Sequence, residues 1–170
     1  MTDPLRVGIV GVGWGALVQV PAFRAVPEFD VVALCARTSE SLTAAGRRTG
    51  IADLSTDWRS FVQRDDLDVI SIATPTVAHH DQVVAAISAG KHVLCEKPQA
   101  LGDDDALEML TRAEDKGIAH AVCFEDRWSP AKYAARQLID SGYLGTPYSV
   151  RVDARVDYWH PTHALQSEWM

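Results

Sequence analysis

The sequence predicts an α/β fold of the doubly wound type, in which helices cover both faces of a parallel sheet. Three observations support this prediction. Short runs rich in Val, Ile and Leu alternate with amphipathic stretches along most of the chain, a glycine-rich turn follows the first of these runs, and the alternation changes character after Gly145. We expect the segment after Gly145 to be the first strand of a truncated second α/β domain.

The short apolar runs are expected to form buried parallel strands, because runs of aliphatic residues suit strands that are covered on both faces. They cover residues 5–12, 29–37, 67–74, 91–97 and 118–124. The stretches that follow the last three strands have helical character, and each ends in a glycine, as helices often do. We expect helices within residues 77–90, 103–117 and 129–142.

The composition is that of an ordinary globular protein, since 47% of the 170 residues are hydrophobic and 23% are charged. The formal net charge of −7 argues against a broad surface for nucleic acid. The three cysteines, Cys35, Cys95 and Cys123, are far apart and lie in or beside apolar runs, so neither a disulfide framework nor a metal site is expected. No signal peptide and no membrane span is recognisable, so we expect a cytoplasmic protein.

Residues 11–16, GVGWGA, follow the first predicted strand and fit the pattern G-x-G-x-x-A. In a dinucleotide-binding Rossmann fold, Gly11 would make the tight turn, Gly13 would let a pyrophosphate approach the backbone, and the small Ala16 would let helix and strand pack closely. The following helix would direct amide N–H groups at the phosphates. A glycine-rich turn without a ligand is the alternative, but the flanking strand and helix favour dinucleotide binding.

The second predicted strand bears on the choice of cofactor. An acidic residue that binds the ribose hydroxyls of NAD would stand about 20 residues after the glycine loop, where this chain has Ala36. Arg37, Thr38 and Ser39 follow, and a guanidinium with two hydroxyls can bind a 2′-phosphate. NADP is therefore favoured over NAD, with an Arg37 that is merely solvated as the alternative.

Residues 147–158 alternate strictly between apolar and polar side chains, which is the pattern of a strand with one face in solvent. Such a strand needs antiparallel neighbours, for which the sequence offers no candidates. We expect a dinucleotide-binding domain over residues 1–126, followed by the opening strand of a second domain that is either truncated or completed by another chain.

The glycine loop, the segment ATPTVAHH (73–80) and the motif EKP (96–98) together resemble the Gfo/Idh/MocA family of NAD(P)-dependent oxidoreductases. The resemblance covers essentially the whole chain. It implies a Rossmann domain followed by a larger α/β domain, whose open sheet carries substrate residues and forms homo-oligomer contacts. Residues 127–170 would then hold a crossing helix and the start of this C-terminal substrate and oligomerisation domain, which is incomplete here. It also implies hydride transfer between a nicotinamide cofactor and a sugar, polyol or related alcohol or carbonyl compound.

The resemblance also implies roles for individual residues of this chain. The expected cofactor-binding residues are Gly11, Gly13, Trp14 and Ala16 at the pyrophosphate, Arg37 and Thr38 at the adenosine end, and Thr74, Pro75, His79, Glu96 and Lys97 toward the nicotinamide. Lys97 is the expected catalytic residue, and the family's other catalytic groups lie in the second domain and have no counterpart here. The Lys97–Pro98 bond is commonly cis in this family.

Lys97 follows a parallel strand at its carboxyl end, where open α/β sheets bind their ligands. It would act as an acid or base toward the substrate oxygen, or as a fixed cation that polarises this oxygen. These two roles stay open, as does the reading of Glu96 and Lys97 as polar residues where a strand meets solvent.

Other readings are weaker. The chain could be a non-catalytic NADP(H)-binding module or a fragment without turnover, although such a module has no use for an amphipathic strand at 147–158. A methyltransferase would require an acidic residue where Arg37 stands. His160 and His163 are not expected to bind metal, because Pro161 prevents a helix that would align them. Trp169 resembles a family tryptophan that can contact the cofactor or the substrate.

Overall fold

The computed structural model describes residues 3–153, and its centre is a six-stranded sheet. The strands lie in the order β3-β2-β1-β4-β5-β6, and neighbouring strands are parallel throughout. Their bounds are β1 (Leu5–Val10), β2 (Phe29–Cys35), β3 (Asp53–Ser55), β4 (Val69–Ile72), β5 (His92–Cys95) and β6 (His120–Val122). The chain starts in the middle of the sheet and builds outward in both directions, so the predicted doubly wound α/β fold is confirmed.

The edge strand β3 is an element that the sequence pattern did not predict. It has only three residues, which are mostly exposed, and it pairs with the end of β2. A strand this short and polar has too few apolar residues to give a recognisable pattern, and shortness is one way in which proteins protect a sheet edge.

Helical segments connect the strands, and local capping explains several of their ends. Thr38 accepts a hydrogen bond from the Ser41 amide at the start of α2, and Gly50 ends this helix with a φ of 75°. Asp57 caps α3 by accepting from the Arg59 amide. The segments are η1 (Gly15–Gln19), α1 (Val20–Arg24), α2 (Ser39–Thr49), α3 (Trp58–Phe61), η2 (Thr76–Ala78), α4 (His79–Ser88), α5 (Asp103–Asp115), η3 (Glu125–Trp128) and α6 (Pro130–Asp140).

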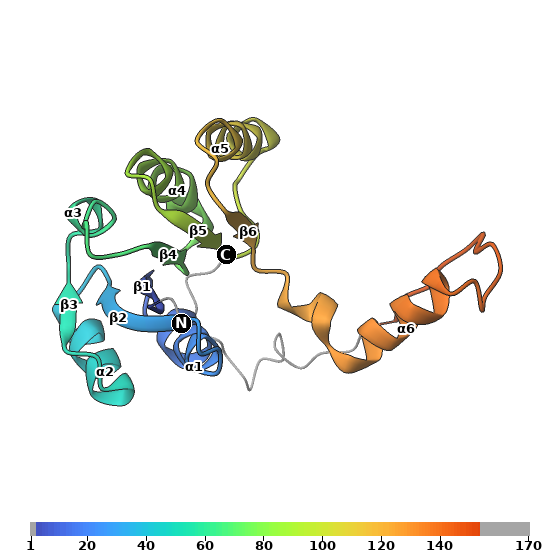
Figure 1. Cartoon of the computed structure of the whole chain (residues 1–170), viewed down its shortest axis with the longest axis horizontal. Helices are drawn as coiled ribbons and strands as arrows, with labels where there is room; N and C mark the ends of the chain where they lie inside the picture. Colours follow the sequence, from blue (N-terminus) through green and yellow to red (C-terminus); the bar gives the residue numbers. More distant parts are fainter. Residues whose placement is uncertain (1–2, 154–170) are drawn as a thin grey trace. The chain divides into compact units, whose positions relative to one another are not determined.

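The helices cover both faces of the sheet (Figure 1). On one face, α1 and α2 enclose a core that includes Ile9 and Leu34. On the other face, α3, α4 and α5 enclose a core that includes Phe61, Ile70 and Ile72. Because side chains alternate along a strand, the aliphatic runs of β1 and β4 supply both cores at once. Among residues 3–153, no helix is long and apolar enough to cross a membrane.

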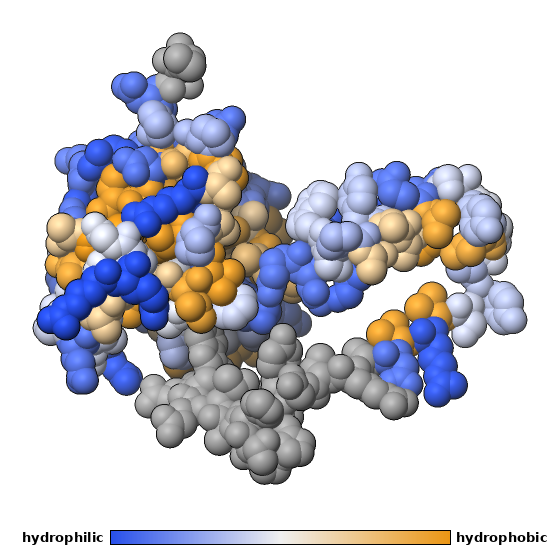
Figure 2. Space-filling view, turned by 90° about the horizontal axis from the view of Figure 1, so that it is seen from below, coloured by the Kyte–Doolittle hydropathy of each residue, from blue (hydrophilic) through white to orange (hydrophobic). Residues whose placement is uncertain are grey.

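The described residues divide after Cys123 into two compact units. In the second unit, the rings of Trp128 and Tyr133 stack with their centroids 6.1 Å apart, and Lys132 forms an ion pair with Asp126. Apolar and polar side chains lie side by side on the surface of this unit (Figure 2). The large apolar side chains that α6 and the turn after it expose are Tyr133, Leu138, Ile139, Tyr143 and Leu144.

The strand predicted over residues 147–158 is not formed in its described part, since residues 147–153 have no regular secondary structure. A strand is held by hydrogen bonds to a neighbouring strand, and residues 3–153 provide no such neighbour for this segment. Residues 154–158 lie outside the described residues, as do His160, His163 and Trp169.

An ion-pair network around Arg64 predicts acid sensitivity of the fold. Arg64 donates to the carboxylates of Asp53 and Asp66, at 2.6 and 2.7 Å from Nη2, and these bonds lower the pKa of both carboxyls. The network therefore stabilises the fold above pH ~4, where an unfolded aspartate is ionised, and this contribution is lost as the pH falls further.

We expect Arg64→Ala to lower the free energy of unfolding at pH 7 by less than about 1 kcal/mol, because the pairs are solvent-accessible. The variant should also lose less stability than the parent protein between pH 5 and 2. Urea unfolding followed by circular dichroism measures both effects, with the exposed Arg47→Ala as control. Equal losses of stability with acid in parent and variant would contradict the assignment.

The buried cysteines yield a second prediction. Burial raises the pKa of the Cys35 thiol and of the Cys95 thiol to about 12. Because the thiolate is the reactive form, both should react slowly with a disulfide reagent such as DTNB at pH 8 in the folded protein, and rapidly in urea. Mass spectrometry locates the labelled cysteines, and fast labelling of Cys35 or Cys95 without urea would contradict their burial.

Candidate functional site

The candidate site lies at the edge of the sheet where the strands have their carboxyl ends. Because the strands are parallel, the loops after β1, β2, β4 and β5 all leave from this edge. The order of the sheet reverses between β1 and β4, and a crevice at such a point is where open α/β sheets bind ligands. The parts of these loops next to the strand ends are residues 11–14, 36–38, 73–75 and 96–98.

The first loop turns at Gly11, at a position that only glycine can occupy. Its φ is 101°, and an added Cβ atom would lie 2.2 Å from the carbonyl oxygen of Ala73. The Gly11 amide donates to the Cys35 carbonyl over 2.8 Å, while the Ala73 amide donates to Val10 over 2.7 Å. The loop is thus held against both neighbouring strands.

Gly13 differs from Gly11 in having open space where a side chain would begin. An added Cβ atom at Gly13 would meet nothing within 4 Å, and the residue is exposed, so a ligand can approach its backbone. Trp14, the next residue, is 38% exposed. This backbone fits a dinucleotide pyrophosphate, whose close approach a side chain would block.

Gly15, which the sequence analysis did not single out, lies close to β1 and leaves no room for a side chain. An added Cβ atom would lie 2.7 Å from Cγ2 of Ile9. Ala16, the predicted packing residue, is buried as well, with 3% of its surface exposed. The third glycine of the loop was the available signal, but the G-x-G-x-x-A pattern directed attention to position 16.

At the end of β2, Ala36 stands where an acidic residue would bind a ribose, and Arg37 and Thr38 follow at the surface. The hydroxyl of Thr38 caps α2, and it lies 2.8 Å from the hydroxyl of Ser41. Arg37 is exposed directly before this cap. The structure therefore brings a guanidinium to the start of a helix, which is a favourable place for an anion.

The loop after β4 contains Thr74 and Pro75, and His79 begins the helix beyond it. The Thr74 hydroxyl donates to Oε1 of Gln82 over 2.7 Å, and Pro75 is exposed. His79 has no exposed surface, and its ring nitrogens lie 2.7 Å from the Thr74 carbonyl and 3.0 Å from the Pro98 carbonyl. His79 thus joins the loop after β4 to the loop after β5 from within the protein.

Glu96 and Lys97 follow β5 and differ sharply in exposure. Glu96 is 3% exposed, whereas Lys97 is an exposed residue, and the Lys97–Pro98 bond is cis, as the resemblance implied. Gln19 donates to Oε1 of Glu96 over 2.9 Å, and the Lys97 amide donates to Oε2 over 3.3 Å. A buried carboxylate with hydrogen bonds to both oxygens therefore lies next to an accessible ammonium group.

Three buried or partly buried polar residues of this region were missed by sequence reasoning. They are Gln19, Ser71 and Gln82. Gln19 and Ser71 are each a single polar residue in an apolar stretch, LVQVPAF and VISIA. That isolation was the available signal, but the two bond to each other and Gln19 to Glu96 across 52 and 77 residues, which only the fold shows. Gln82 follows His79, His80 and Asp81 and gave no such signal.

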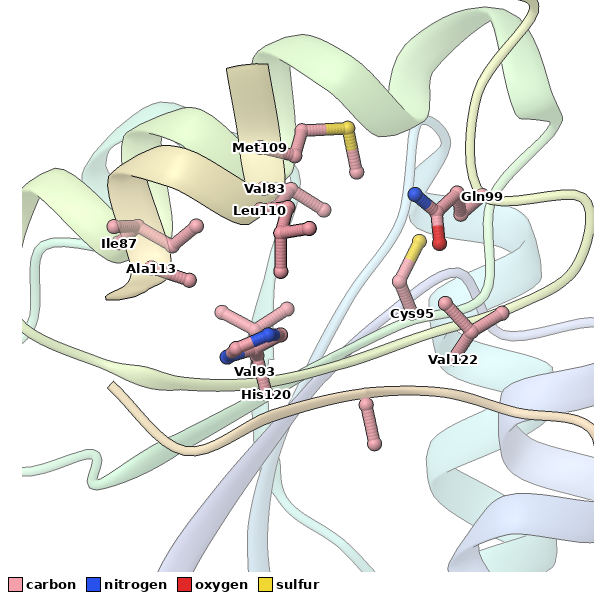
Figure 3. Close-up of a pocket in the computed structure, with 11 residues that line it drawn as sticks. Val83, Ile87, Val93, Cys95, Gln99, Met109, Leu110, Ala113, His120 and Val122 are labelled. Atoms are coloured by element: carbon pink, nitrogen blue, oxygen red, sulfur yellow. The ribbon is translucent and has the colours of Figure 1, made fainter. Parts of the chain in front are cut away.

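A separate apolar cavity of about 300 Å³ lies between α4, α5 and the strands β5 and β6 (Figure 3). Figure 3 shows side chains from both helices above those of the strands, with the Cys95 thiol and the Gln99 amide at one end. Its lining contains none of the residues expected to bind the cofactor.

The model of an oxidoreductase family with an NAD-binding Rossmann fold, Gfo/Idh/MocA, matches residues 5–124. Levoglucosan dehydrogenase of Pseudarthrobacter phenanthrenivorans is 36% identical in an alignment of 155 residues that covers 86% of this chain and 40% of that protein. D-apiose dehydrogenase of Paraburkholderia graminis is 35% identical over 147 residues, 86% of this chain and 39% of that protein.

Solved structures give the same result. An oxidoreductase domain protein from Kribbella flavida superposes with a TM-score of 0.79 at 34% identity, covering 85% of this chain and 41% of that one. The 3-ketoreductase KijD10 from Actinomadura kijaniata, solved with NADP and TDP-benzene, gives 0.75 at 27% identity, covering 82% and 43%. The chain thus spans about 40% of the length of the relatives it matches. It belongs to the Gfo/Idh/MocA family of oxidoreductases.

Proposed function

We propose that this chain is the cofactor-binding half of an NADP-dependent oxidoreductase that transfers a hydride between the nicotinamide and a sugar, polyol or related alcohol or carbonyl compound. Residues 1–126 would form the dinucleotide-binding domain, and residues 127–170 the crossing helix and the start of a substrate domain. Relatives that are named for sugar oxidation or reduction support this substrate class.

The observation that carries the proposal is the contrast between the first two glycines of the loop. Gly11 is packed against Ala73 with no space for a side chain, whereas Gly13 faces open space. The first makes the turn, and the second leaves room for the pyrophosphate, which would accept hydrogen bonds from the amides of residues 13–16.

The adenosine end of the cofactor would lie at Arg37 and Thr38. The Arg37 guanidinium can form two hydrogen bonds to a 2′-phosphate, and the start of α2 adds a favourable dipole. Ala36 has no carboxylate that would repel this phosphate or bind the ribose hydroxyls of NAD. These features favour NADP over NAD.

The nicotinamide end would lie between the loops after β4 and β5. Thr74 and Pro75 would contact it from one side, and Glu96 would accept a hydrogen bond from the adjacent ribose. His79 would act from within, because both of its ring nitrogens already lie at backbone carbonyls of these two loops.

Lys97 is the proposed catalytic residue. The nicotinamide, when bound, supplies the hydride chemistry. In the direction of alcohol oxidation, the substrate hydroxyl loses its proton as the carbon loses a hydride, and a neutral Lys97 amine can accept that proton. In the direction of reduction, the ammonium form returns a proton to the oxygen or stabilises its negative charge. The exposed Lys97 side chain can reach such a substrate oxygen at the sheet edge.

Arg37→Ala tests the preference for NADP. The unaltered chain should bind NADPH at least tenfold more tightly than NADH, and the variant should lose most of this difference, since a charge-assisted contact to phosphate is removed. Fluorescence titration of both cofactors measures the ratio of the two Kd values. Arg47→Ala, an exposed arginine farther along α2, is the matched control. Equal affinities of the parent protein for NADPH and NADH would overturn the preference.

Gly13→Val tests the position of the pyrophosphate. The open space at Gly13 should let the variant fold with nearly unchanged thermal stability, while the new side chain occupies the space of the phosphates and weakens NADPH binding at least tenfold. Gly102→Val is the matched control, because an added Cβ atom there also meets nothing within 4 Å. If Gly13→Val bound NADPH as tightly as the control, the proposed pyrophosphate position would be wrong.

A further inference from the structure

Gln19 is a polar residue in the core, 4% exposed, and it belongs to the helical segment that directly follows the glycine loop. Burial of an amide is unfavourable unless its hydrogen-bonding groups find partners. Gln19 has partners on two other elements, Ser71 in β4 and Glu96 after β5. These partners are 52 and 77 residues away in the sequence.

The partners dictate how the Gln19 amide is oriented. The Glu96 carboxylate can only accept, so the Nε2 group of Gln19 must face it, at 2.9 Å. The Oε1 atom then faces Ser71, whose hydroxyl donates to it over 2.8 Å. Ser71 itself has no exposed surface and lies in the interior of β4. Both hydrogen bonds therefore run in the same direction: Ser71 donates to Gln19, and Gln19 donates to Glu96.

This chain of hydrogen bonds ends at the Glu96–Lys97 peptide. Oε1 of Glu96 accepts from Gln19, and Oε2 accepts from the Lys97 amide over 3.3 Å. The Glu96 amide also donates to Ile72 over 2.9 Å, which continues the sheet by one residue. Gln19 thus holds the Glu96 side chain, which also accepts from the Lys97 amide, while the Cys95 thiol donates to the Glu96 carbonyl over 3.4 Å.

We propose that Gln19 is a positioning residue that links the glycine loop to the nicotinamide end of the site. Through Glu96 it holds the Glu96–Lys97 segment in place, and Ser71 holds Gln19 in the required orientation. This inference rests on the proposed binding of a nicotinamide dinucleotide. It assigns no catalytic role to Gln19, which is buried and reaches the site only through Glu96.

The test compares two ligands on the full chain. Adenosine 2′,5′-bisphosphate fills only the adenosine end, whereas NADPH also fills the nicotinamide end. In Gln19→Met, the affinity for the bisphosphate should stay within about twofold, while the affinity for NADPH should fall about tenfold, as expected for the loss of a hydrogen bond to a charged group. Titration calorimetry gives both Kd values, and Gln63→Met at an exposed glutamine is the control.

Two further variants separate positioning from mere packing. A neutral histidine has one donor and one acceptor nitrogen, so Gln19→His can accept from Ser71 and donate to Glu96, and it should retain NADPH affinity within about threefold. Ser71→Ala should show a weaker form of the Gln19→Met effect. If thermal melts show that Gln19→Met does not fold, the NADPH affinities of Gln19→His and Ser71→Ala test the positioning role.

The outcomes are distinct. Three results would each overturn the positioning role. In Gln19→Met, the affinities for the bisphosphate and for NADPH could fall equally, or the affinity for NADPH could stay unchanged. In Gln19→His, the affinity for NADPH could be as low as in Gln19→Met. If the parent protein bound the bisphosphate and NADPH with equal affinity, or bound neither, the proposed function itself would fail, irrespective of Gln19.

Discussion

The fit of Gly11 against the Ala73 carbonyl is the constraint on which the site depends. It holds the end of β1 against the end of β4, at the point where the order of the sheet reverses. The loops after these strands must therefore leave the sheet side by side. A side chain at position 11 would push them apart, and the open backbone at Gly13 would lose its position. The geometry of the candidate site thus follows from one close approach between two backbones.

Around this approach, the polar groups of the site are held by buried hydrogen bonds. His79 connects the carbonyl groups of the loops after β4 and β5, and Gln19 connects β4, the helix after β1 and Glu96. In the part of the chain that the structure describes, every buried side-chain nitrogen or oxygen atom has a hydrogen-bond partner. Lys97, directly after the buried Glu96, is exposed. A buried network of hydrogen bonds beside an exposed lysine side chain suits a residue that would meet a substrate oxygen.

The sequence predicted what depends on local pattern. The apolar runs predicted β1, β2, β4, β5 and β6, and the glycine loop and the EKP motif were predicted to lie at the edge of the sheet that carries the candidate site. It could not predict β3, whose three mostly exposed residues lack a pattern, nor the contacts of Gln19, whose partners are distant in sequence. The role of His79 also depended on the fold, because only the structure brings Pro98 to its ring. The strand expected from residue 147 onward depended on neighbours that residues 3–153 do not provide.

Hydrogen–deuterium exchange with and without NADPH tests the central claim most directly, since it reports on all four loops in one experiment. The account predicts that the cofactor slows exchange in residues 11–16, 36–39, 73–79 and 96–98 together, and leaves the peptides of α3 and β3 unchanged. Protection confined to the apolar cavity between α4 and α5, or no protection at all at saturating NADPH, would contradict the assignment of this sheet edge as the dinucleotide site.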